Sequence, residues 1–247
     1  MDVMFVKNAM SESLGRDVVF FDSIPSTNSE AMRLAGLGAE HGTLVVADSQ
    51  VGGKGRLGRA WQSPPGLNLY FSLVLRPKVG LDRVALLGLA CAVGIAKGFG
   101  LSIKWPNDIL DGQRRKVAGI LSELECQDNR VSHVVLGVGL NVNQAEFPLD
   151  LPNAVSLCET HGPLDRVRVL TDVVASIEYW CQQVESHPAG VLAQWRGHWV
   201  DRGREVRVGT RVGQAIDVRE DGALMLRTQD GVEAVVSGDV LRTFQDD

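Results

Sequence analysis

The sequence has few cysteines and histidines, and neither type is clustered. The four cysteines never form a C-x-x-C pair, and the five histidines include no H-E-x-x-H motif. Metal sites built from sulfur and nitrogen ligands need such clusters, so a site of this kind is not predicted. Cys91 lies in the apolar run LLGLACAVGIA. We expect a buried free thiol there, because free cysteine is among the most buried residue types.

Long apolar runs and an excess of positive charge are also missing. No run approaches the roughly 18 to 20 apolar residues of a membrane span, and the N-terminal MDVMFVKNAM lacks the apolar segment of a signal peptide. The formal net charge of −5 argues against sequence-independent nucleic-acid binding, which needs a basic surface. The sequence therefore predicts a cytoplasmic protein that spans no membrane and binds no DNA.

The composition is that of a globular protein large enough for a main domain and a small second one. The 247 residues are 45% hydrophobic and 22% charged. Residues 1–200 contain strands and helices, whereas residues 201–247 alternate apolar and polar residues with Asp-Gly turns at 221–222 and 230–231. We expect a small β-barrel of SH3-like size over residues 201–247, packed on the main domain.

Periodicity and turn signals place the elements of the main domain. Thr27, with Glu30 three residues later, predicts a capping box that opens a short helix. The apolar segment 81–100 predicts a helix buried against a sheet. Strands are expected at 17–22, 42–49, 67–77, 116–125 and 133–143, and further helices at 165–185 and from Pro188.

The stretch VGGKGRLGRAW, residues 51–61, concentrates glycine and positive charge in an acidic protein. Its glycines match G-x-G-x-x-G, but a dinucleotide fingerprint should open a helix and be followed about 20 residues later by an acidic residue. Here Pro64 and Pro65 prevent a helix, and Lys78 has the wrong charge. No Gly-Lys-Ser/Thr ending of a phosphate-binding P-loop is present either.

These 11 residues, called the glycine loop below, carry Lys54, Arg56 and Arg59. Glycine lets backbone N–H groups approach an anion, and arginine offers a planar fork to phosphate or carboxylate. A flexible loop of this kind can order itself around a charged ligand and exclude water. The alternative is a solvated basic loop, which explains the charges but not the glycine spacing or Trp61.

Three more stretches suggest a site at the ends of successive elements. KWPND (104–108) sets an amide and a carboxylate beside a lysine, a combination suited to phosphate oxygens and magnesium; the alternative is an ordinary β-turn. Lys116 stands at the mouth of an apolar strand, where the alternative is a protective charge at a strand end. GVGLNVN (137–143) indicates close approach of a ligand or a backbone, or else a bulge. Together they predict an active site along one edge of a sheet.

In this order, the motifs resemble those of the biotin–protein ligases, also called biotin–[acetyl-CoA-carboxylase] ligases. The resemblance covers nearly the whole chain from about residue 17. It rests on STN (26–28), DSQ (48–50), GKGRLGRAW (53–61), GLNLYFSLVLRP (66–77), KWPNDI (104–109), RKVAGIL (115–121) and GVGLNVN (137–143).

The resemblance implies a fold and an activity. The expected fold is α+β: a mixed β-sheet backed by helices, related to class II aminoacyl-tRNA synthetases and lipoate ligases, with a C-terminal SH3-like domain. The implied enzyme joins biotin to ATP with Mg²⁺, giving biotinyl-5′-AMP and pyrophosphate. It then transfers biotin to one lysine of a biotin carboxyl carrier domain of a carboxylase.

The resemblance also implies roles for individual residues. Lys116, Arg56 and Asp108 would be catalytic, with Lys116 bridging the biotin carboxylate and the α-phosphate and Asp108 near magnesium. The expected biotin-binding residues are Ser26, Thr27, Asn28, Gln50, Lys54, Gly55, Arg56, Trp61, Lys116, Gly137 and Gly139. The expected ATP-binding residues are Arg56, Arg59, Lys104, Asn107, Lys116 and Asn141.

Two departures from the family pattern change these expectations. Lys54 stands where the family usually has arginine, so the charge is kept but the bidentate fork is lost. Many bacterial relatives carry an N-terminal helix-turn-helix domain, whereas here the catalytic resemblance begins within about 20 residues of the start, too few for a domain. We therefore expect a short form without DNA binding.

Other interpretations stay open on the sequence. A lipoate–protein ligase would share the fold and the adenylate chemistry, and a non-catalytic biotin- or adenylate-binding regulator would share the pocket. An α/β protein with a basic surface loop is the plainest reading. A homodimer is also considered, since the strand at 137–143 would pair across a two-fold axis if it lay at a sheet edge.

Overall fold

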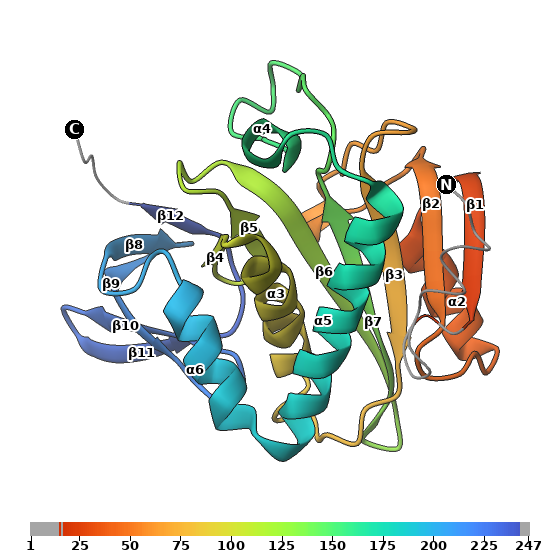
Figure 1. Ribbon diagram of the computed structural model, residues 1–247. Helices are drawn as coiled ribbons and strands as arrows, with labels where there is room; N and C mark the ends of the chain where they lie inside the picture. Colours follow the sequence, from red (N-terminus) through yellow and green to blue (C-terminus); the bar gives the residue numbers. More distant parts are fainter. Residues whose placement is uncertain (1–14, 16, 243–247) are drawn as a thin grey trace.

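The computed structural model describes residue 15 and residues 17–242, which form two sheets with helices packed around them (Figure 1). The main sheet has seven strands in the order β1-β2-β3-β7-β6-β5-β4 and is mixed, because β1 and β2 are parallel and the remaining pairs antiparallel. Its strands are β1 (Val18–Ile24), β2 (Leu44–Gln50), β3 (Leu69–Leu75), β4 (Ser102–Lys104), β5 (Asp108–Leu110), β6 (Lys116–Gln127) and β7 (Arg130–Leu140).

The two faces of this sheet are covered unequally, and the alternation of side chains along each strand shows how. Leu73 and Leu75 of β3 belong to the large core, whereas Val74 between them packs with Ala31 and Ala35. The large core includes the helices α3 (Leu86–Phe99), α5 (Arg166–Ser186) and α6 (Pro188–His198). The opposite face is covered by the short helix α2 (Thr27–Gly36). Because α2 spans only part of that face, the rest is available for a site.

The central hairpin β6–β7 follows from its turn residues. Asp128 and Asn129 both have positive φ, 51° and 60°, which is the conformation that a two-residue hairpin turn requires. The apolar residues of β7 from Val134 to Leu140 are buried, because β3 and β6 flank this strand and both faces of the sheet are covered.

The strand and helix predictions of the main domain are confirmed in position, with two corrections. The N-cap of α2 is Ser26, whose hydroxyl accepts from the Ser29 amide at 3.5 Å, and not Thr27. Glu30 forms an ion pair with Arg33 at 2.7 Å instead of closing a capping box. Second, the strand at 137–143 is not at an edge: β7 lies between β3 and β6, so its backbone groups are already paired. That route to a homodimer is therefore wrong.

The C-terminal segment forms a separate antiparallel sheet of five strands in the order β11-β10-β9-β8-β12. Its two outer strands, β11 and β12, are not paired with each other within the described residues, so the predicted SH3-like barrel is not confirmed as a closed barrel. The strands are β8 (Glu205–Val208), β9 (Arg211–Val218), β10 (Leu224–Thr228), β11 (Gly231–Val235) and β12 (Val240–Arg242).

The C-terminal sheet packs firmly on the main part. Its buried residues, among them Val206 and Val240, belong to the same apolar core as α3 and α6. Trp105 Nε1 donates to the backbone oxygen of Gly222 at 3.0 Å, and Arg196 Nε donates to Asp217 Oδ1 at 2.5 Å. The division at residue 200 stays a prediction; the ends of the two predicted domains, residues 1–14 and 243–247, lie outside the described residues.

The structure also bears on two expectations about the apolar segments of the chain. Cys91 is a buried free cysteine, as predicted, and burial raises the pKa of its thiol. None of the helices within the described ranges is both long and apolar enough to cross a membrane.

Candidate active site

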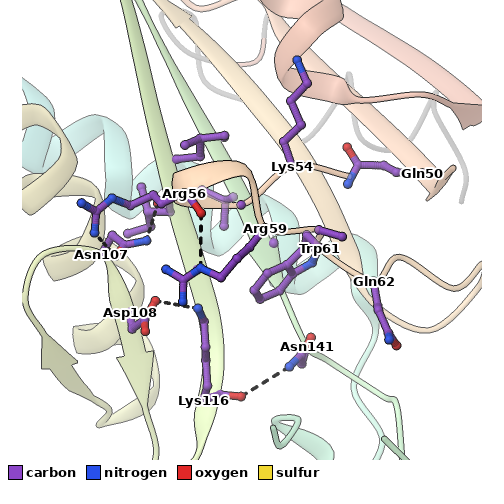
Figure 2. Close-up of a pocket in the computed structure, with 18 of the residues that line it drawn as sticks. Gln50, Lys54, Arg56, Arg59, Trp61, Gln62, Asn107, Asp108, Lys116 and Asn141 are labelled. Carbon is purple, nitrogen blue, oxygen red and sulfur yellow. Dashed lines mark hydrogen bonds and ion pairs between the residues drawn. The ribbon is translucent and has the colours of Figure 1, made fainter. Parts of the chain in front are cut away.

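A cavity of about 300 Å³ opens on the face of the main sheet that α2 leaves partly uncovered. It is enclosed by the start of α2, the glycine loop, the strands β6 and β7, and the segment 141–154 (Figure 2). The predicted residues that line it are Ser26, Thr27, Asn28, Gln50, Lys54, Gly55, Arg56, Arg59, Trp61, Asn107, Asp108, Lys116, Gly137, Gly139 and Asn141. Every predicted site residue except Lys104 therefore borders one cavity.

The floor of the cavity is bare backbone, and Trp61 lies on it. Gly119 of β6 and Gly139 of β7 are direct cross-strand partners. A Cβ at Gly119 would lie 2.9 Å from Trp61 Cζ3, and one at Gly139 would overlap the indole nitrogen ring. Both positions must be glycine for the indole to lie flat on the sheet, which explains the glycines within these strands. Trp61 Nε1 is buried and has no hydrogen-bond partner within the described residues.

At one end of the cavity, called the neutral end below, the lining side chains around Asn28 are uncharged, and the Glu123 carboxylate that accepts from Asn28 is not among the lining residues. A Cβ at Gly137 would overlap the Asn28 amide, so this glycine makes room for it. The Ser72 hydroxyl lies 2.8 Å from Asn28 Oδ1, and Asn28 Nδ2 donates to Glu123 Oε2 at 2.6 Å. These contacts fix which side of the amide carries oxygen and which carries nitrogen.

Thr27 and Gln50 continue this network toward the glycine loop. Gln50 Oε1 accepts from the Thr27 amide at 2.9 Å and lies 3.2 Å from the Thr27 hydroxyl. Gln50 Nε2 donates to Ser63 Oγ at 2.9 Å, just beyond the loop, and Ser72 Oγ lies 2.9 Å from Thr27 Oγ1. Thr27 and Asn28 are both buried, and so is Ser72. The neutral end is thus rigid before any ligand binds.

The other end is charged, and Lys116 lies at its centre. Lys116 Nζ forms an ion pair of 2.6 Å with Asp108 Oδ1 and lies 5.3 Å from the centre of the Trp61 ring. Figure 2 shows Trp61 between Gln50 and this ion pair. The indole therefore separates the neutral end from the charged end.

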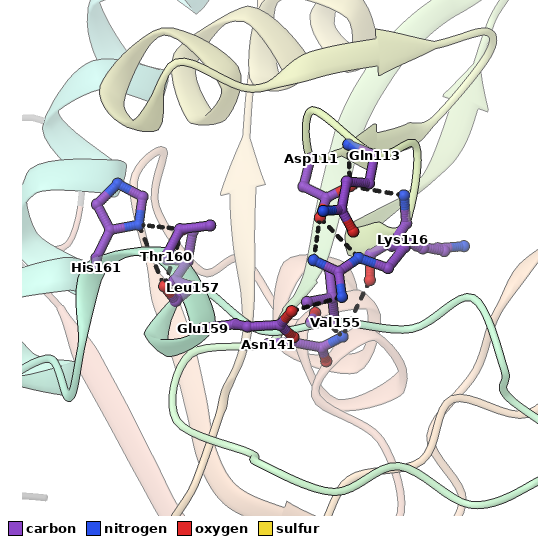
Figure 3. Close-up of polar contacts among 10 residues, drawn as sticks. Asp111, Gln113, Lys116, Asn141, Val155, Leu157, Glu159, Thr160 and His161 are labelled. Atoms are coloured by element: carbon purple, nitrogen blue, oxygen red, sulfur yellow. Dashed lines mark hydrogen bonds and ion pairs between the residues drawn. The ribbon is translucent and has the colours of Figure 1, made fainter.

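The backbone of Lys116 is fixed by its neighbours on both sides (Figure 3). Its backbone amide donates to the backbone oxygen of Asn153 at 2.6 Å, and its backbone oxygen accepts from the Val155 amide at 3.0 Å. Asn141 Nδ2 donates to the carbonyl oxygens of Lys116 and Val155, at 3.4 and 3.0 Å. Asn141, predicted to bind ATP, thus uses its side-chain amide N–H groups to hold the backbone of Lys116 in place.

Arg115, which directly precedes Lys116 in the chain, stabilises this region through two ion pairs. Its guanidinium contacts Asp111 at 2.7 Å and Glu159 at 2.6 Å. The bond to Glu159, followed by that to Asp111, raises the pKa of Arg115. Arg115 therefore ties the turn before β6 to the short helix α4 (Cys158–His161), which follows the cavity-lining segment.

The glycine loop is a small hairpin closed over the cavity. Lys54 and Ala60 form an antiparallel bridge, and the Gly55 amide donates to the backbone oxygen of Arg59 at 2.7 Å. Arg56 Nη1 donates to Asn107 Oδ1 at 3.2 Å. The tip of the hairpin therefore contacts the KWPND stretch, as the combination of these motifs implied.

Two of the predicted cations are not gathered with the others. Lys104 ends β4 opposite Asp108, but its side chain is not among those that line the cavity. Lys54 borders the cavity, yet Figure 2 shows its side chain extending away from Lys116 and Arg56. In this arrangement the charged end is formed by Arg56, Arg59 and Lys116.

Some residues of the site carried no signal in the sequence. Ser72 and Glu123 lie inside strands and were not predicted as site residues, but they orient Asn28. Phe147 and Leu151 line the cavity from a segment without regular structure, where no motif marks them. Only the position of Ser72 among apolar residues of a buried strand offered a hint.

The donor set fits a magnesium ion held mainly by a substrate. No group of three or more His, Cys, Asp or Glu side chains that could cage a metal occurs in the described part of the chain. Asp108 is the only carboxylate among the described residues that line the cavity, and it lies beside the Asn107 amide. Mg²⁺ is commonly bound by one or two carboxylates together with phosphate oxygens and water, and Asp108 suits that mode.

Comparisons with known proteins give a consistent result. The model of the biotin/lipoate A/B protein ligase family matches residues 20–141. The bifunctional ligase/repressor BirA of Bacillus spizizenii is 36% identical over 247 residues, with 93% of this chain and 75% of the relative covered. The biotin–[acetyl-CoA-carboxylase] ligase of Paracoccus denitrificans is 34% identical, with 87% of this chain and 96% of the relative covered.

Solved structures agree with these relatives. The biotin protein ligase from Aquifex aeolicus in complex with biotin and ATP matches with a TM-score of 0.75 at 30% identity. The match covers 92% of this chain and 98% of that one, so both the main sheet and the C-terminal sheet take part.

Proposed function

Because the chain belongs to the biotin protein ligase family, we propose that it is an ATP-dependent enzyme that attaches biotin to a carrier protein. In the first step the biotin carboxylate attacks the α-phosphorus of ATP, an anhydride bond forms, and pyrophosphate leaves. In the second step a lysine amine of a biotin carboxyl carrier domain attacks the acyl carbon, and AMP leaves. The net products are the biotinylated carrier, AMP and pyrophosphate.

The single observation that carries this proposal is that one cavity joins a neutral hydrogen-bond network to a cluster of cations across Trp61. Biotin has a neutral polar ring at one end and a carboxylate at the other. In our proposal the ring meets Thr27, Asn28 and Gln50, the hydrocarbon tail lies against the face of the indole that points away from the glycine floor, and the carboxylate reaches Lys116.

The charged end supplies what the first step needs. A carboxylate and an α-phosphate are both anions, so cations must lie where they meet. Lys116 would contact both, and Arg56 and Arg59 would face the phosphates from the glycine loop. Bound Mg²⁺ would add positive charge at the phosphates, with Asp108 as its ligand from the protein. In the ligand-free chain Asp108 instead neutralises Lys116 at 2.6 Å.

The glycine loop would protect the intermediate. A mixed anhydride hydrolyses in water, so covering it between the two steps preserves the activated biotin. The base that accepts the proton of the carrier lysine is a separate question. We propose Asp108 for this role, since it is the carboxylate nearest to Lys116.

The deciding experiment is biotin-dependent exchange of labelled pyrophosphate into ATP, with lipoate as the rival acid. We expect exchange with biotin and none with lipoate. Exchange with lipoate alone would identify a lipoate–protein ligase. No exchange with either acid, in folded protein that still binds biotin, would identify a non-catalytic binding protein and contradict the proposal.

The carrier is proposed to be the biotin carboxyl carrier domain of a carboxylase, because such an acceptor is named for the Paracoccus denitrificans relative. Mass spectrometry of a carrier domain incubated with this chain, biotin and ATP would show one added biotin on one lysine. Homodimer formation, the SH3-like character of the C-terminal sheet, the cytoplasmic location and the lack of DNA binding stay predictions of the sequence.

A further inference from the structure

The carboxylate of Asp239, in the segment between β11 and β12, pairs with both arginines of the glycine loop. Arg59 Nη2 lies 2.8 Å from Asp239 Oδ2, and Arg56 Nη1 lies 3.5 Å from Asp239 Oδ1, so each oxygen faces a different arginine. Arg56 Nη1 also donates to the backbone oxygen of Gly238 at 3.2 Å, across 182 positions of sequence. Among the residues that the structure describes, Asp239 is the only carboxylate that pairs with either arginine.

The two partners differ in rigidity. Asp239 precedes β12, whose Val240 is buried and paired with Val208 of β8. Gly238 has a φ of 144°, and a Cβ there would lie 2.5 Å from Val208 Cγ1, so the backbone is pressed against the core. The tip of the glycine loop has no buried residue of its own and is closed on itself only by short hairpin bonds.

We propose that Asp239 is a positioning residue: by pairing with Arg56 and Arg59, it keeps the glycine loop seated over the cavity while no nucleotide is bound. The two attachments differ in kind: the Arg56 side chain is only 17% exposed and also donates to Gly238, whereas the Arg59 pair with Asp239 is shorter but its side chain is 59% exposed and screened by water. The inference deepens the proposed function, in which phosphates would replace Asp239 at these arginines; the seating itself does not depend on that function.

The rate at which trypsin cleaves the glycine loop reports how often the loop leaves its position over the cavity. Trypsin cleaves after lysine and arginine in segments that can extend into its active site, and the bonds after Lys54, Arg56 and Arg59 lie in a hairpin that must open before it can extend. In ligand-free full-length chain, we expect Asp239→Asn to be cleaved at these three bonds about fivefold faster than wild type, because cleavage follows the population of the open loop. Peptide mass spectrometry over time measures each bond separately.

The matched control is Asp230→Asn, which removes the same charge from the turn between β10 and β11 of the same sheet. Its loop should be cleaved at the wild-type rate. Equal cleavage of wild type and Asp239→Asn, or equal acceleration in both variants, would overturn the proposal. Pyrophosphate exchange is scored separately, so a chain that shows the cleavage difference without exchange would refute the ligase function and leave the seating role standing.

Salt gives a second test that requires no substitution. Ion pairs that are partly exposed weaken as ionic strength rises. The cleavage rate of the loop is normalised to that of a short peptide substrate, which corrects for the effect of salt on trypsin. At about 1 M NaCl, the normalised rate of the wild-type loop should approach the rate of Asp239→Asn at low salt. The normalised rate of Asp239→Asn itself should not change with salt. If Asp239→Asn did not fold, a salt-independent wild-type loop would by itself overturn the proposal.

Discussion

The two ends of the cavity differ in how their polar groups are satisfied. At the neutral end, Thr27, Asn28 and Gln50 are bonded to one another or to strand residues, and Thr27 and Asn28 are buried. At the charged end, Lys116 and the loop arginines are paired with carboxylates and remain partly exposed. A buried network in which every polar group has a partner is fixed before binding, whereas an ion pair near water can exchange its partner for a phosphate at little cost. The comparison indicates that the rigid end recognises the ligand and that the charged end, whose ion pairs can exchange partners, carries out the chemistry.

The largest expected effect tests the charged end. Lys116→Ala should reduce biotin-dependent pyrophosphate exchange about a thousandfold, because it removes the cation where two anions meet, while biotin affinity changes by less than about fivefold. Exchange rates and isothermal titration with biotin measure the two quantities. A variant that lost biotin binding as completely as exchange would show that the two ends are not separate.

Asp108 separates the two steps of the reaction. Asp108→Ala should slow adenylation about a hundredfold, because it removes the proposed magnesium ligand and leaves Lys116 without its partner. Transfer from preformed biotinyl-5′-AMP to a carrier domain, followed in single-turnover experiments, should slow as well if Asp108 is the base. Unchanged transfer would exclude the base role and retain the metal role.

Gly139 tests the floor between the two ends. Gly139→Ala should weaken biotin binding about thirtyfold, because the new Cβ would overlap Trp61 and lift the indole. Gly98→Ala is the control, since its Cβ would meet nothing within 4 Å in α3. Titration of biotin against both variants measures the effect. Equal affinity of both variants for biotin would mean that the indole does not form a binding surface.

Ser72 tests the rigidity of the neutral end. Ser72→Ala removes the hydroxyl that lies between Thr27 and Asn28, and we expect the KM for biotin to rise about tenfold while the KM for ATP stays unchanged. Steady-state exchange with each substrate varied in turn makes this distinction. A parallel rise of both KM values would point to general unfolding of the sheet.

The smallest effect is expected at Lys54. Its side chain is exposed and extends away from Lys116 and Arg56, so Lys54→Ala should change exchange by less than about threefold. Arg56→Ala, measured beside it, should cost about a hundredfold. A large effect at Lys54 would show that this amine turns toward the ligand when the loop closes on nucleotide.

Much of the fold followed from local patterns, and the exceptions have a physical cause. The expected strands and long helices lie where alternation, glycines and prolines placed them, because those signals act within a few residues. Thr27 was misplaced as a cap because Ser26 and Thr27 are both capping residues, and only the folded chain engages the Thr27 hydroxyl with Gln50 and Ser72 and leaves Ser26 as the cap. Strand order was likewise invisible: nothing in GVGLNVN tells a central strand from an edge.

The motifs by themselves determined the family, the pocket residues and the need for positive charge, because binding chemistry restricts which residue types can stand at each position. Tertiary structure alone decided which of these residues work together. It left Lys104 outside the cavity, turned Lys54 away, and recruited Ser72, Glu123 and Asp239 from distant segments. Such choices depend on which strands become neighbours and on which face of the sheet a side chain lies, and these are properties of the folded chain.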